Sequence, residues 1–155
     1  MTTKKRNIII GNAVLCEDIR QERSNKFILI GVFSSDMLIE KLPCSVPLAF
    51  FLEAVVRKRG QTSLAIKLSG PGEGEFVLRA VLTTTRDNEN VSMPLPRAEV
   101  LLECEGTFRL AVSEDEANWT TVIEKKVTQQ DGLWTLHPIA LRQPSEQSQP
   151  AVPAS

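Results

Sequence analysis

The sequence predicts an all-β protein, a single antiparallel β-sandwich of about seven to eight strands of Ig-like or Greek-key type. Two observations support this class. Short segments rich in Val, Ile, Leu, Phe and Thr recur between turn signals, and in several of them apolar and polar residues alternate. A length of 155 residues, 42% of them hydrophobic and 24% charged, fits one globular domain with one core.

The first two predicted strands cover about residues 13–21 and 26–33. The polar residues 22–25 between them suit a hairpin turn. In the second strand, apolar side chains fall on both faces. We therefore expect this strand to be central, with both of its faces covered.

Residues 46–59 fit two patterns. Apolar residues such as Leu48, Phe51 and Val55 follow a helical stripe, with Gly60 as a stop signal. Every even-numbered residue from Val46 to Val56 is also apolar, which favours a strand. We predict the strand, with the helix as the alternative.

The remaining predicted strands cover about residues 64–68, 76–85, 99–105, 108–112 and 119–127. In and next to the strand at 108–112, Phe108, Leu110 and Val112 are expected in the core, and Thr107, Arg109 and Ser113 are expected to face water. The glycine-rich run 70–74 and the acidic run 114–118 are expected to be hairpin turns, and the stretch with Arg86 and Arg97 a long connection.

The ends of the chain and the cysteines bear on location. Residues 143–155 read QPSEQSQPAVPAS, which predicts a disordered tail after a domain at 1–142. The basic start and the apolar run 8–10 resemble a targeting signal, but Gly11 and Asn12 interrupt that run. The three widely spaced cysteines are expected to be buried free thiols, Cys16 and Cys104 within strands. A cytoplasmic location is therefore expected.

Four stretches resemble a family of uncharacterised bacterial proteins: Leu15-Cys16-Glu17-Asp18, then residues 25–33, then Pro43 and Pro47, and finally residues 105–110. The resemblance covers about residues 13–127. It implies a β-sandwich, a domain of unknown function with no established activity.

Side chains for catalysis or metal binding are scarce. His137 is the only histidine, and it precedes a proline close to the predicted tail. Three cysteines and one histidine contain no close pair of the kind that a zinc site uses. We therefore expect no enzyme activity, no cofactor and no metal. Trp119 and Trp134 are expected to pack in the core or at a sheet edge.

The net charge of −1 provides no global field for nucleic acid or a membrane. The main hypothesis is an intracellular binding module that docks a protein partner through loops or edge strands. Its candidate binding residues are basic and lie in two turns: Arg57, Lys58 and Arg59, and Arg23 with Lys26. The alternatives are an enzyme or small-ligand protein using Glu17, Asp18 and Arg20, or weak nucleic-acid binding through the basic loops.

Overall fold

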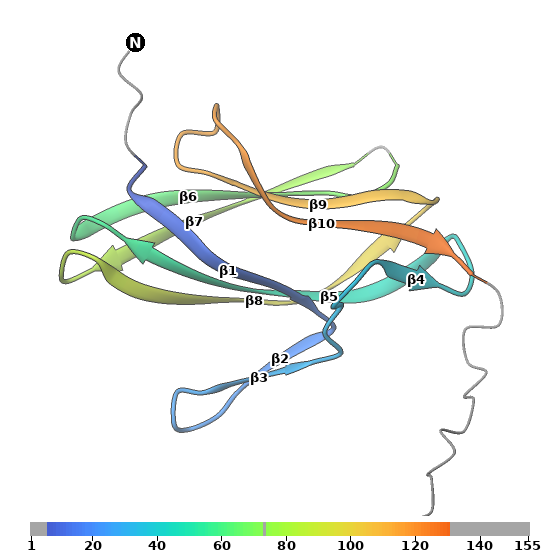
Figure 1. The fold of residues 1–155 in the computed structure, drawn as a ribbon, viewed down its shortest axis with the longest axis horizontal. Coiled ribbons are helices and arrows are strands. Elements are labelled where there is room, and N and C mark those ends of the chain that lie inside the picture. Colours follow the sequence, from blue (N-terminus) through green and yellow to red (C-terminus); the bar gives the residue numbers. More distant parts are fainter. Residues whose placement is uncertain (1–5, 73, 131–155) are drawn as a thin grey trace, which may run out of the picture.

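The structure, a computed structural model, describes residues 6–72 and 74–130, and all helical or strand structure within these ranges is β-strand (Figure 1). The strands are β1 (Ile8–Cys16), β2 (Asp18–Gln21), β3 (Phe27–Ile30), β4 (Met37–Ile39), β5 (Cys44–Val56), β6 (Gly60–Ser69), β7 (Glu75–Thr84), β8 (Glu89–Leu102), β9 (Gly106–Ser113) and β10 (Thr120–Gln129). The prediction of an all-β chain is confirmed. The predicted count of seven or eight strands is wrong, since the described residues form 10 strands.

The strands form three sheets, whereas the predicted β-sandwich has two. One sheet has the order β1-β5-β8, with antiparallel neighbours throughout. A second has the order β4-β10-β9-β6-β7, in which only the short β4 runs parallel to its neighbour. The third is the hairpin β2-β3.

The core lies between the three-stranded and five-stranded sheets. β5 and β9 contribute its centre, where the rings of Phe50 and Phe108 stack with their centroids 6.1 Å apart. The even-numbered residues of β5 from Leu48 to Val56 are all buried, so the prediction of a strand for this stretch is confirmed over the helix. Phe108, Leu110 and Val112 are buried as predicted.

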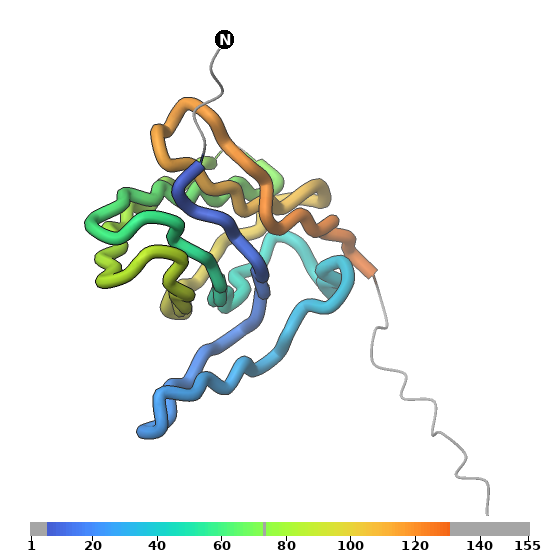
Figure 2. Tube along the Cα trace, turned by 60° about the vertical axis from the view of Figure 1, so that its left-hand side comes forward, coloured from blue at the N-terminus to red at the C-terminus, as the bar shows by residue number. Residues whose placement is uncertain are grey.

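The hairpin β2-β3 confirms the predicted turn after residue 21 but corrects the bounds of the strands predicted within residues 13–33. The expected first strand is divided at Glu17, whose backbone N–H donates to the carbonyl oxygens of Ile30 and Gly31. β3 pairs only with β2 within the described residues, so the expectation of a central strand is wrong. Figures 1 and 2 show the hairpin projecting below the body of the molecule. Phe27 covers Phe51 at 5.2 Å between ring centroids, while Ile28 stays exposed.

Residues 89–97 were expected to be a connection, but they form the first part of β8. This strand contains Pro94 and Pro96, and proline removes a ladder donor. β8 lies at the edge of its sheet, where one side of the backbone needs no donor. The edge position explains why two prolines are accommodated in a strand of 14 residues.

Two side chains differ from their predicted environment. Cys104 lies beyond the end of β8 and is exposed, so the expectation of a buried strand residue is wrong. Ser113, expected in water, is 3% exposed because the loop after β9 folds back over it and its hydroxyl bonds to Asp115.

The described residues contain no helix that is long and apolar enough to cross a membrane. His137, Trp134 and the predicted boundary at residue 143 lie outside the described residues.

Candidate functional site

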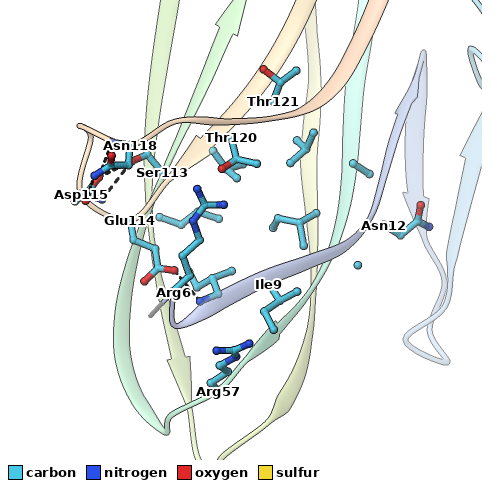
Figure 3. Close-up of a pocket in the computed structure, with 17 residues that line it drawn as sticks. Arg6, Ile9, Asn12, Arg57, Ser113, Glu114, Asp115, Asn118, Thr120 and Thr121 are labelled. Carbon is cyan, nitrogen blue, oxygen red and sulfur yellow. Dashed lines mark hydrogen bonds between the residues drawn. The ribbon is translucent and has the colours of Figure 1, made fainter. Parts of the chain in front are cut away.

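An elongated hollow of about 1020 Å³ lies between β1 and β10, where the two large sheets share no backbone ladder (Figure 3). Its apolar lining comes from both sheets: Ile8, Ile10, Ala13, Leu64, Val112 and Val122. A smaller hollow of about 330 Å³ continues it toward Phe33 and shares Ala13 and Val122. We call the two hollows together the seam.

One wall of the seam is the free edge of β1. Within the described residues β1 pairs only with β5, so its other edge has no neighbouring strand. Residues of an antiparallel strand alternate between bonding to the neighbour and pointing away from it. The N–H of Ile8 donates to Glu114 and the C=O of Leu15 accepts from Phe33, so these two residues point away from β5.

Ile10 and Ala13 lie between these two capped positions. Ile10 is two residues after Ile8 and Ala13 two before Leu15, with the register shift of a bulge between them at Gly11. Their N–H and C=O groups therefore point into the seam as well. No described backbone group bonds to them there. The middle of β1 thus presents two residues of unpaired strand edge above an apolar floor.

The other wall is β10. This strand pairs with β9 along its length and with β4 only from Val127 to Gln129. Just before that short parallel ladder, Asp36 accepts the N–H of Lys126. The first half of β10, with Thr120 and Thr121, faces the seam opposite β1 (Figure 3).

The end of the seam where β1 begins carries charges of both signs. Arg6, Arg57 and Glu114 gather there in Figure 3. Both carboxylate oxygens of Glu114 accept backbone N–H groups, from Ile8 at 2.8 Å and Asn7 at 3.1 Å. No described carboxylate lies within 4.0 Å of the guanidinium of Arg6 or Arg57.

Asp115 is similarly occupied within its own loop. Its carboxylate accepts the backbone N–H of Asn118 at 2.8 Å and of Ala117 at 3.0 Å, together with the side chains of Asn118 and Ser113. These hydrogen bonds, the strongest from the backbone of Asn118, hold the pKa of Asp115 well below its usual range. This carboxylate therefore stays ionised and keeps the loop in shape.

The predicted binding residues lie in two separate places. Arg57, Lys58 and Arg59 form the turn between β5 and β6, and Arg57 lines the seam while the other two are exposed beside it. Arg23 and Lys26 lie in the turn of the β2-β3 hairpin. Both views place that hairpin tip well below the turn of Arg57, so the structure does not bring the two groups together (Figures 1 and 2).

The other candidate residues lie away from the seam. Arg20 pairs with Asp18 at 3.5 Å on the exposed hairpin, and neither lines the seam. Trp119 is half-buried and donates its indole N–H to the carbonyl of Glu116 at 3.1 Å. The Lys67 ammonium lies over the Trp119 ring, 4.6 Å from the ring centroid. Across residues 6–72 and 74–130 no three His, Cys, Asp or Glu side chains are grouped so as to hold a metal ion.

Sequence reasoning missed the residues that build the seam, above all Ile10, Ala13 and Val122. The apolar run 8–10 resembles a targeting signal, but β-branched residues in a row also indicate a strand. That signal could have extended the first strand to Ile8. The free edge itself follows from pairing between distant strands, which the pattern of one strand does not reveal.

Comparison of the sequence with models of known protein families, and with curated proteins, gives no match. The resemblance to uncharacterised bacterial proteins stays a prediction.

Proposed function

We propose that this chain is a non-catalytic binding module whose protein partner adds an extended segment to the free edge of β1 in the seam. The observation that carries the proposal is the pair of outward-pointing residues Ile10 and Ala13, unpaired between positions that are already capped. Strand addition uses such an edge, because main-chain hydrogen bonds supply affinity and adjacent pockets accept alternate side chains.

The surroundings of this edge fit a peptide strand. An unpaired edge is ordinarily protected by charges, bulges or a covering loop. In β1 the start is capped by Glu114 and the end by Phe33, while the middle has no partner among the described backbone groups. The hollow beside it has apolar residues on its floor, which would bury alternate side chains of the added strand.

The charged residues of the enzyme alternative give that function less support. Asp18 and Arg20 pair with each other on an exposed hairpin, and neither reaches the seam. The seam-lining carboxylates Glu114 and Asp115 are hydrogen-bonded to the backbone, and a general base must be free to accept a proton from a substrate. We also propose that the two large sheets, which share one core, form a β-sandwich to which the β2-β3 hairpin is added.

The test uses peptides of about ten residues, long enough to span β1, selected from a random library for binding to the full chain. A selected peptide is expected to slow hydrogen exchange of the Ile10 and Ala13 amides. Ala13→Pro removes an outward N–H and leaves the β1-β5 ladder intact, so it is expected to weaken peptide binding about tenfold or more.

A second variant keeps the test valid if Ala13→Pro does not fold. Thr121→Trp adds bulk on the opposite wall of the seam, at an exposed position. Its matched control is Thr83→Trp, an exposed threonine of β7 on an edge strand far from the seam in the sheet order. Binding lost in Thr121→Trp and kept in Thr83→Trp supports the proposal. Failure to select any peptide, or equal binding to the seam variants and wild type, overturns it.

A further inference from the structure

The end of the seam beside the β5-β6 turn contains cations that have no ionic partner within residues 6–72 and 74–130. They are Arg6, Arg57, Lys58, Arg59 and, in the neighbouring turn between β7 and β8, Arg86. The two turns lie together because the N–H of Asn88 donates to the carbonyl of Arg57 at 3.1 Å. None of the five forms an ion pair with a described carboxylate.

Five carboxylates lie at the β7-β8 turn and in the β9-β10 loop, and each already accepts at least one hydrogen bond from the chain. Glu114 and Asp115 accept backbone N–H groups, as described above. Asp87 accepts the N–H of Arg59 at 2.8 Å, and Glu89 accepts those of Thr85 and Arg86.

The fifth carboxylate, Glu116, forms two hydrogen bonds with the guanidinium of Arg79 at 2.6 and 2.7 Å. With Arg79 counted beside Glu116, six cations and five carboxylates make the region nearly neutral in sum. An incoming carboxylate would find cations with no ionic partner among the described residues, whereas an incoming ammonium would meet carboxylates that already accept hydrogen bonds.

Resting on the proposed function, we infer that the segment bound in the seam carries acidic side chains at the end that lies over Arg6 and Arg57. Ile8 is the last capped position before that end, two residues from Ile10. At about 3.3 Å per residue, a strand paired with Ile10 reaches the arginines within about two to four further residues. The partner is thus an extended acidic peptide segment of another protein.

The balance of charges also determines whether the acidic residues of the bound segment affect association or dissociation. Long-range attraction is weak where cations and carboxylates are nearly equal in number. The acidic residues contribute to affinity instead through short-range, charge-assisted hydrogen bonds that form once the segment is bound. We therefore expect the acidic residues to slow dissociation more than they speed association.

The peptides selected above provide the test. They are expected to contain Asp or Glu at one end, and replacing these by Asn or Gln should weaken binding to the wild-type chain about three- to tenfold. Arg57→Glu should weaken binding of the acidic peptide similarly and leave the Asn/Gln peptide nearly unaffected, while Arg57→Lys should keep most of the affinity. The matched control is Arg23→Glu, on the hairpin tip, for which we expect no change.

The outcomes separate this inference from the proposed function. One outcome overturns the inference alone. The selected peptides contain no acidic residues, fail to bind Thr121→Trp, and bind Arg57→Glu as well as they bind the wild type. Acidic peptides that are insensitive to both Ala13→Pro and Thr121→Trp overturn the proposed function and, with it, the inference. Acidic peptides sensitive to Arg57→Glu and to the seam variants support both.

Discussion

Glu114 accepts a hydrogen bond of 2.8 Å from the backbone N–H of Ile8, a residue 106 positions earlier in the chain. The same carboxylate accepts the N–H of Asn7 at 3.1 Å. One side chain of the β9-β10 loop thus caps the first strand of the other large sheet. It also sets where the open edge of β1 begins.

Replacing this cap should destabilise the chain. Glu114→Ala leaves two partly buried N–H groups without their acceptor, and we expect the free energy of unfolding to fall by about 1–3 kcal/mol. Urea denaturation measures it. The control is Glu124→Ala, which removes an exposed pair with Arg109 at 2.7 Å and should cost less than about 1 kcal/mol. Equal losses in the two variants would contradict the capping role.

Asp115 should make stability depend on acid pH. Its pKa in the fold lies below that in the unfolded chain. Its contribution is therefore fully present above the unfolded value, about 3.9, and is lost as the pH falls below it. Asp115→Asn should lower the melting temperature at pH 7, and the difference from wild type should narrow below about pH 4. A difference that stays constant down to pH 2 would show that the charge of Asp115 is not responsible. Glu22→Gln on the hairpin is the control.

Gly31 should resist substitution. Its φ is +65°, and a Cβ placed there would lie 2.5 Å from a carboxylate oxygen of Glu17. Gly31→Ala is expected to lower the free energy of unfolding by about 1–2 kcal/mol, because alanine is strained in the left-handed conformation and its Cβ would also press against Glu17. Gly74→Ala is the control, because nothing lies within 4 Å of its added Cβ. Thermal unfolding of the two variants distinguishes them, and an unchanged Gly31→Ala would contradict the geometry.

The three thiols should react at different rates. Cys16 is buried, donates to the carbonyl of Ala49 at 3.6 Å, and has its pKa raised by burial. Cys44 is half-buried and Cys104 exposed. A thiol reagent at pH 8 should modify Cys104 first, and Cys16 only after denaturant is added. The fast phase should disappear in Cys104→Ser. A fast phase that persists there would show that another thiol is accessible.

Residues 143–155 should be dispensable for stability. Their composition offers little apolar surface to offset the entropy of ordering the segment. Deleting them should leave the melting temperature nearly unchanged, which differential scanning calorimetry measures. A fall of many degrees would show that the segment packs on the domain.

The sequence was sufficient for local structure where apolar residues alternate along a strand. Alternation placed Phe108, Leu110 and Val112 in the core, and it correctly favoured a strand over a helix for residues 46–59. It also placed Arg57 in a turn. These features depend on residues close to one another in the chain, so the period of side chains along a strand determines them.

The pairing of strands required the tertiary structure. Residues 26–33 carry apolar side chains on both faces, which is typical of a central strand. Within the described residues, however, β3 pairs only with β2, and Phe27 and Phe33 pack against the body while Ile28 stays exposed. The first part of β8 escaped prediction because its prolines are tolerated only at a sheet edge. The seam exists because β1 and β10, distant in sequence, lie side by side with facing edges that pair with no other described strand there. The sequence therefore determined the all-β class and the buried faces of the alternating segments. Hydrogen bonding between strands is non-local, so the tertiary structure alone decided how the strands pair and which edge stays open among the described residues.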